Sequence, residues 1–170
     1  EAIGLNFIDT YQRTGLYPTR MPAVLGLEGA GVVEAIGDGV TRFAVGDRAA
    51  FGNGPLGAYA EFHVVSADRA VKIPARVSSR DAAAAMLKGM TAEFLLRRCY
   101  PVKKGDAVLI HAAAGGVGTI LTQWAKALGA QVIATVGSED KADLAQSLGA
   151  DEVILYRDED VAARVKAITG

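Results

Sequence analysis

Residues 105–129 contain the feature that most constrains the fold, a short apolar run, a glycine cluster and a helical pattern in succession. The apolar run 107–110 is typical of a buried parallel strand. Three glycines then fall within residues 115–118, and apolar residues recur at helical spacing from Val117 to Leu128. A second apolar run covers 130–136, so the sequence predicts a strand–turn–helix–strand unit whose turn is A-x-G-x-x-G.

The small residues of this turn suit a dinucleotide. Ala113 keeps the turn tight, Gly115 lets the backbone approach a pyrophosphate, and Gly118 lets the helix pack against the strand. The free N–H groups at the helix start would face the anion. A tight turn with no ligand is the alternative, but the flanking strands and helix match a dinucleotide site. The expected phosphate-binding residues are Ala114, Gly115, Gly116, Val117 and Gly118.

From residue 105 onward the chain repeats a strand–helix unit, with Leu-Gly-Ala at 128–130 and again at 148–150. The expected strands are 107–111, 131–136 and 152–155, and the expected helices are 116–128, 139–148 and 159–168. Ser138 and Asp158 are the predicted N-caps of the last two helices. The order βαβαβα predicts the first half of a Rossmann sheet, with its first strand as an exposed edge.

The first 75 residues are dense in glycine and broken into short apolar runs. Strands are expected within 1–5 and at 32–36, 48–51, 59–65 and 70–73, which predicts a small barrel or sandwich. Ser78 is expected to cap a helix over 78–88, and a second helix is expected over 91–100, with Thr91 as a candidate N-cap. The predicted domains are therefore 1–88 and 89–170.

The net charge of −1 over 170 residues supports neither a nucleic-acid nor a membrane partner. No stretch has the length of a membrane span or the layout of a signal peptide, so we expect a cytoplasmic protein. Cys99 is the only cysteine, and with His63, expected at the surface, and His111, expected in the core, it forms no recognisable metal site.

The signature residues Gly105, Asp106, Leu109, 113–116, Gly118, Gln123 and Lys126 carry a family resemblance. Their spacing resembles that of zinc-free quinone oxidoreductases of the ζ-crystallin type, in the medium-chain dehydrogenase/reductase superfamily. The resemblance covers all 170 residues and implies a partial GroES-like barrel followed by half of a Rossmann NADP-binding domain. It also implies a homodimeric parent enzyme, of which we expect this chain to be a fragment that alone reduces no quinone and associates through its exposed strand edge.

Zinc-dependent members of that superfamily carry a Cys-His pair and a Gly-His-Glu motif. In the matching stretches this chain has Asn6 and Phe7 for the pair and Leu27 for the second histidine. Zn²⁺ needs three or four such ligands, so we expect no metal. A quinone is already electrophilic, and the protein then needs only to position it and donate hydrogen bonds.

The resemblance implies the residues that contact the nicotinamide and the quinone; it implies no catalytic side chain. On the cofactor side these are Asn6, Tyr11, Tyr17 and Thr91, and on the quinone side Asn6, Asp9 and Tyr17. A structural hydrogen bond is the alternative role of Asp9, and a loop aromatic covering the barrel is that of Tyr17.

The choice of cofactor depends on the end of strand 131–136, where an NAD enzyme places a carboxylate. No carboxylate lies at that tip, which predicts NADPH. Glu139 and Asp140 are counter-evidence, but acids in a first helical turn also favour the helix dipole. The expected 2′-phosphate contacts are Gly137, Ser138, Lys141 and, implied by the resemblance, Tyr156.

The sequence thus predicts an NADPH-dependent, zinc-independent quinone reductase. A reductase of enones or enals from the same superfamily has an equally metal-free site and remains an alternative. A non-catalytic role is another, because some relatives are lens structural proteins or bind RNA, although the near-neutral charge argues against RNA.

Overall fold

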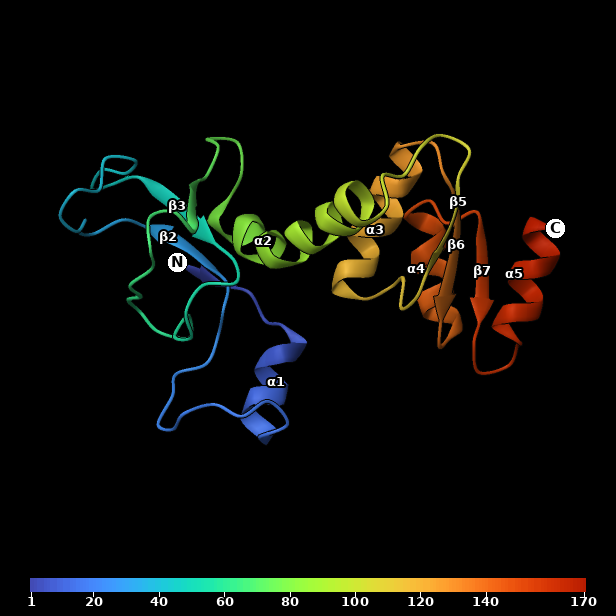
Figure 1. The fold of residues 1–170 in the computed structure, drawn as a ribbon, viewed down its shortest axis with the longest axis horizontal. Coiled ribbons are helices and arrows are strands. Elements are labelled where there is room, and N and C mark those ends of the chain that lie inside the picture. The colour runs from blue at the N-terminus through green and yellow to red at the C-terminus, as the bar shows by residue number, and fades with distance from the viewer. The chain divides into compact units, whose positions relative to one another are not determined.

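The computed structural model describes residues 1–170, which form two compact units, Glu1–Met90 and Thr91–Gly170 (Figure 1). The first unit is built on an antiparallel sheet and the second on a parallel sheet. No helix in either unit has the length and apolar character needed to cross a membrane.

The first unit contains a four-stranded sheet in the order β1-β2-β3-β4, and consecutive strands are antiparallel. The strands are β1 (Ala2–Ile3), β2 (Gly29–Val32), β3 (Arg48–Phe51) and β4 (Ala70–Lys72). Ala30 and Ala50 pair across β2 and β3, and both are buried with Ala83 in the core of this unit. Such small side chains let helix α2 (Ser79–Glu93) lie close to the sheet.

Two strand predictions in this unit are wrong. The strand expected over 32–36 lies at Gly29–Val32, because Gly29 and Gly31 join the ladder opposite Phe51 and Ala49. The partly alternating stretch 59–65 forms no strand. Its apolar residues Phe62 and Val64 are exposed, so the alternation reflects no buried face. The predictions at 48–51 and 70–73 agree with β3 and β4.

Helix α1 (Phe7–Thr14) is short and defined at both ends by local hydrogen bonds. Asn6 is its N-cap in an extended conformation, and the Asn6 N–H donates to Asp9 Oδ2 over 2.8 Å. Gly15 ends the helix with φ 79°, a left-handed conformation that glycine adopts without a steric penalty.

The two helices expected over 78–88 and 91–100 are one continuous helical stretch. Helix α2 passes through Gly89 and runs directly into the π-helical turn η1 (Phe94–Cys99). Gly89 costs a helix interior only about 1 kcal/mol relative to alanine, which packing outweighs. Ser78 caps the start as expected, since its Oγ accepts from the Asp81 N–H over 3.0 Å. Pro101 follows the end of η1 closely and cannot continue a helix.

The second unit follows the predicted βαβαβα order. Its elements are β5 (Ala107–Ile110), α3 (Gly116–Ala127), β6 (Gln131–Val136), α4 (Glu139–Ser147), β7 (Glu152–Leu155) and α5 (Val161–Thr169). The strands are parallel in the order β5-β6-β7. Helices α3 and α4 cover one face, and α5 lies on the other side of the sheet (Figure 1).

The core of the second unit lies around the central strand. Every residue of β6 except Gln131 is buried, whereas Leu109 of β5 is exposed because β5 is an edge strand.

The predicted N-cap of α5 is wrong by two residues. Asp160 and not Asp158 is the cap, and its side chain accepts from the Ala163 N–H, because the helix starts only at Val161.

Candidate nucleotide and acceptor sites

The predicted site residues form two groups, one within each unit. In the second unit they lie at the carboxyl ends of the parallel strands, where open α/β sheets bind ligands. In the first unit they lie on and beside α1. Thr91 lies inside α2, so its expected role as an N-cap is wrong.

The turn between β5 and α3 depends on close backbone approach. Ala112 has φ 50°, a left-handed conformation that is costly for alanine, and its carbonyl accepts from the Gly115 N–H over 2.8 Å. A Cβ on Gly118 would collide with the Ala112 carbonyl and would lie 2.7 Å from Ala113 Cα. Only glycine therefore fits at position 118.

The start of α3 presents unpaired backbone donors. No carbonyl of the chain accepts from the N–H groups of Gly116, Val117 and Gly118. Gly115 is the extended N-cap and has no side chain that could cover them. Three donors and the positive end of the helix dipole fit a pyrophosphate at this turn.

The carboxyl end of β6 meets that of β7 through Gly137 and Tyr156. The Tyr156 N–H donates to the Val136 carbonyl over 3.2 Å, which carries the strand pairing up to these residues. A Cβ on Gly137 would lie 2.5 Å from the Tyr156 hydroxyl. The phenol of Tyr156 thus occupies the space that a side chain at position 137 would need, including the carboxylate of an NAD enzyme.

Helix α4 begins beside this pair with Ser138 as its N-cap. The Ser138 side chain makes no capping hydrogen bond, so its exposed hydroxyl remains available to a ligand. Lys141 is exposed in the first turn of α4. These groups and the Tyr156 phenol suit the 2′-phosphate of NADP, which needs donors and a cation.

In the first unit Asp9 joins α1 to the loop between β3 and β4. Asp9 is buried, and its Oδ2 accepts from the Asn6 N–H and from the Tyr59 hydroxyl, both over 2.8 Å. Burial, together with the hydrogen bond and the charge of Asp9, raises the pKa of Tyr59 to about 12. Tyr59 therefore stays a proton donor at neutral pH. Asp9 Oδ1 is buried with no partner in the chain.

Tyr11 and Tyr17, both predicted beside the nicotinamide, form an aromatic cluster with Phe7, in which Tyr11 is partly buried. The rings of Tyr11 and Tyr17 lie 5.4 Å apart between centroids, and the ring of Phe7 lies 6.1 Å from that of Tyr11. The Tyr17 N–H donates to the Tyr11 carbonyl, which fixes the loop after α1 against the helix. Tyr17 is half exposed and offers a ring face and a hydroxyl to a ligand.

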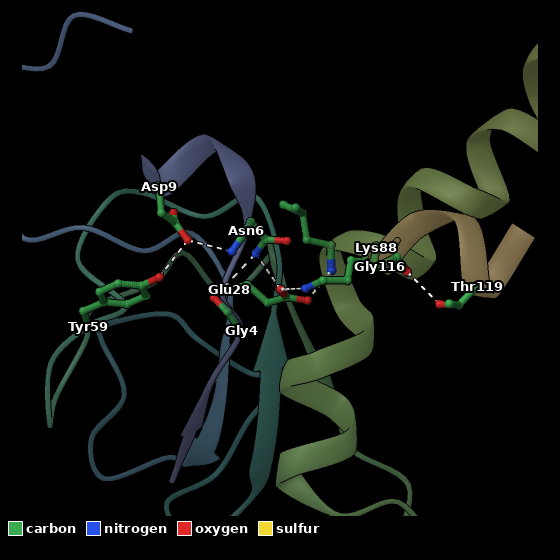
Figure 2. A network of polar contacts seen from close by, with 9 residues as sticks. Gly4, Asn6, Asp9, Glu28, Tyr59, Lys88, Gly116 and Thr119 are labelled. Atoms are coloured by element: carbon green, nitrogen blue, oxygen red, sulfur yellow. Dashed lines mark hydrogen bonds and ion pairs between the residues drawn. The ribbon is translucent and has the colours of Figure 1, made fainter. Parts of the chain in front are cut away.

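Sequence reasoning missed the polar centre of the first unit. Glu28 is fully buried and forms an ion pair with Lys88 over 3.2 Å (Figure 2). Asn6 Nδ2 donates to Glu28 Oε2 over 2.7 Å. The available signal was a single acid within the apolar and glycine-rich run 25–32, because an unpaired buried acid is costly.

The two histidines differ from their predicted settings. His111 is exposed and not in the core, and its Nδ1 lies 3.0 Å from the hydroxyl of the buried Thr135. His63 is partly buried and its ring packs 5.1 Å from that of Phe51. No group of three or more His, Cys, Asp or Glu side chains is arranged to hold a metal ion.

Comparison with sequence families supports the two-part architecture. Residues 1–75 match the alcohol dehydrogenase GroES-like domain, and residues 116–170 match the zinc-binding dehydrogenase family. The fold predicted from the sequence, a partial GroES-like barrel followed by the start of an NADP-binding domain, is confirmed.

Curated relatives match almost the whole chain. Quinone oxidoreductase of Pseudomonas aeruginosa is 56% identical over 99% of this chain and 52% of its own length. A 2-haloacrylate reductase of a Burkholderia species is 48% identical over 99% of this chain and 53% of its own length. The chain thus spans about half the length of the curated relatives it matches.

Solved structures give the same result. Quinone oxidoreductase of Escherichia coli in complex with NADPH superposes with a TM-score of 0.98 at 51% identity, over all of this chain and 52% of that one. Quinone oxidoreductase of Pseudomonas syringae superposes with a TM-score of 0.96 at 61% identity, over 99% of this chain and 52% of that one.

Proposed function

Because the chain belongs to the quinone oxidoreductase family of the medium-chain dehydrogenases and reductases, we propose that it forms part of an NADPH-dependent quinone reductase that works without zinc. The observation that carries this proposal is the carboxyl end of β6, where Tyr156 fills the space beside Gly137 and no carboxylate is present. Such a site accepts the 2′-phosphate that distinguishes NADPH from NADH.

The second unit would hold the adenosine and phosphate half of the cofactor. The pyrophosphate would receive hydrogen bonds from the turn that opens α3, and the 2′-phosphate from the start of α4 and from β7. Lys141 would add a point charge next to the 2′-phosphate. The proposed residues are Ala114, Gly115, Gly116, Val117, Gly118, Gly137, Ser138, Lys141 and Tyr156.

The first unit would supply groups for the nicotinamide and the quinone. From this unit we propose Asn6, Tyr11 and Tyr17 for the nicotinamide side, and Asn6, Asp9 and Tyr17 for the quinone. Thr91, the first residue of the second unit, is also proposed for the nicotinamide side. NADPH supplies the hydride, which is the chemistry of the cofactor itself. The side chains of this chain would orient the ring, exclude water and hydrogen-bond to the quinone oxygen as negative charge develops on it.

Metal would have no part in this reaction. The positions that bind catalytic zinc in zinc-dependent relatives are occupied by Asn6, Phe7 and Leu27, none of which is a zinc ligand in ordinary sites. Hydrogen bonds from the protein would therefore replace Lewis-acid activation of the acceptor. We further propose that the complete protein is a cytoplasmic homodimer.

A second candidate, reduction of an activated alkene, is favoured by the 2-haloacrylate reductase at 48% identity. Both reactions deliver a hydride to an electrophilic carbon conjugated with a carbonyl group, so the same metal-free site suits them. A panel of quinones, enones and haloacrylates, assayed with the complete protein and NADPH, separates the two by kcat/KM.

The cofactor site is tested by replacing Lys141 with alanine in the complete protein. The dissociation constants of NADPH and NADH are measured by quenching of Trp124 fluorescence. Lys141→Ala is expected to weaken NADPH binding by about 1–3 kcal/mol, the scale of a hydrogen bond to a charged group, and to leave NADH binding unchanged. Lys166→Ala, at another exposed lysine, on α5, is the matched control and should change neither. Equal losses for both cofactors, or a wild-type preference for NADH, would contradict the assignment.

A further inference from the structure

The first unit contains an ion pair between the fully buried Glu28 and Lys88, beside Asn6 (Figure 2). Lys88 Nζ lies 3.2 Å from Glu28 Oε2, and Asn6 Nδ2 donates to the same oxygen over 2.7 Å. Glu28 Oε1 accepts from the Leu87 N–H over 2.6 Å. The carboxylate is therefore held at both oxygens, and the ammonium group of Lys88 is a neighbour of the Asn6 amide.

The positive end of this ion pair is the more accessible end. The side chain of Lys88 is 19% exposed, whereas that of Glu28 has no exposed surface. An ammonium group has three N–H donors, and Glu28 Oε2 is the one acceptor of the chain that is hydrogen-bonded to it. Two donors of Lys88 are thus left for water or for a ligand.

Stability gives little reason for a lysine at this place, because the desolvation of two buried charges offsets much of their attraction. The charges around Asn6 give a better reason. Asn6 donates to two carboxylates, that of Glu28 from its side chain and that of Asp9 from its backbone N–H. Lys88 is the one base of the chain that forms an ion pair with either of them. Without Lys88 these surroundings would repel a negative charge that forms on a bound acceptor.

We propose that Lys88 is a catalytic residue that stabilises the negative charge forming on the acceptor oxygen. This inference rests on the proposed function, in which Asn6 lies beside the acceptor. The quinone takes up a hydride, that is two electrons and one proton, from NADPH and becomes a hydroquinone monoanion, which then takes one proton from water. Lys88 donates a hydrogen bond to the anionic oxygen, and Glu28 holds the ammonium group in place.

Lys88→Met tests this role, because methionine has a similar length and neither charge nor donor. The rate constant of hydride transfer is measured by stopped-flow absorbance of NADPH, with the complete protein and saturating quinone. It is expected to fall about 10²–10³-fold, the effect of losing one group that stabilises an oxyanion, while the NADPH dissociation constant stays unchanged. A wild-type rate constant, or a loss confined to NADPH affinity, would overturn the proposal.

Lys72→Met is the matched control and should change neither constant. Lys72 lies in the same unit and also pairs with a carboxylate, since its Nζ is 2.7 Å from Asp47 Oδ2. Lys88→Met leaves Glu28 buried without a counter-charge, which can prevent folding. The double variant Glu28→Gln/Lys88→Met removes both charges and is expected to show the same loss of rate. A double variant as fast as the wild type would overturn the proposal.

A series of quinones separates catalysis from a structural role. Negative charge on the oxygen is most costly in quinones whose hydroquinones are the weakest acids, so these should lose the most rate in Lys88→Met. A plot of the logarithm of the rate constant against the pKa of the hydroquinone should therefore be steeper for Lys88→Met than for the wild type. Equal slopes would overturn the proposal, because a structural defect lowers all rates by the same factor.

A final measurement needs neither turnover nor a variant. 4-Nitrophenol resembles the product, and its absorbance distinguishes the phenol from the phenolate. Lys88 should favour the phenolate, so 4-nitrophenol bound to the wild-type protein should have a lower pKa than in water. An unchanged or raised pKa, or no binding, would overturn the proposal. A wild-type protein that transfers no hydride from NADPH to any quinone would instead refute the proposed function.

Discussion

Replacing Gly118 by alanine is expected to destabilise the second unit, whereas the same replacement at Gly89 should stabilise the first. Both glycines lie in helices, Gly118 in α3 and Gly89 in α2. A Cβ on Gly89 meets no atom within 4 Å. A Cβ on Gly118 would meet the Ala112 carbonyl, and would lie 2.7 Å from Ala113 Cα and 2.8 Å from its carbonyl carbon.

The magnitudes follow from these surroundings. Alanine at position 89 reduces the backbone freedom of the unfolded chain and should add about 0.5–1 kcal/mol to the free energy of unfolding. At position 118 the clashing atoms are backbone and cannot rotate away. Overpacking costs about 1–3 kcal/mol, and the helical preference of alanine offsets at most about 1 kcal/mol. We expect a net loss of about 2 kcal/mol and a widened turn that no longer holds the pyrophosphate.

Urea unfolding of both variants measures the two effects. Trp124 is the only tryptophan and packs against the core of the second unit, so its fluorescence reports Gly118→Ala. Far-ultraviolet circular dichroism sums over all helices, α2 included, so Gly89→Ala is read from the shift of that unfolding transition relative to the wild type. A Gly118→Ala variant as stable as the wild type, with undiminished NADPH affinity, would refute the reasoning from the turn geometry. A loss of stability in Gly89→Ala would refute the assignment of open space there.

Two more predictions follow from single side chains. Since the folded state raises the pKa of Tyr59 from 10.0 to about 12, its contribution to stability should be complete below pH 10 and lost as the pH rises toward 12. Relative to Tyr59→Phe, the wild-type free energy of unfolding should fall by up to about 2 kcal/mol over that range, and parallel pH profiles would contradict it. Because Asn6, Phe7 and Leu27 hold the zinc-ligand positions, the purified complete protein should carry no stoichiometric zinc and should keep its activity in chelator. One zinc per chain by elemental analysis would disprove this.

The elements of the second unit could be predicted closely because each has a strong local pattern. The strands predicted at 131–136 and 152–155 agree with β6 and β7, and the predicted helices end within two residues of α3, α4 and α5. Its glycine turn is also a local structure, in which residues 112–118 contact one another. In the second unit, patterns within a few residues were therefore enough to predict the strands, the helices and the glycine turn.

The first unit was harder to predict because its strands are two to four residues long. Such strands have too few side chains for alternation to identify a buried face, and pairing with distant strands decides where each one starts. Strand β2 starts at Gly29, three residues before Val32, where the apolar residues had indicated that a strand would begin. The stretch 59–65 shows the opposite error, since partial alternation occurred there with no strand.

The chemistry of Asn6 shows why residue type alone does not determine a role in the site. An asparagine side chain can donate or accept, and the sequence around it does not distinguish the two. In this protein Asn6 Nδ2 donates to Glu28, 22 residues away, and Glu28 itself accepts from the Leu87 N–H and from Lys88, 59 and 60 residues further along the chain. The surroundings of Asn6 thus depend on correct packing of the segments around α1, β2 and α2, which are far apart in the sequence.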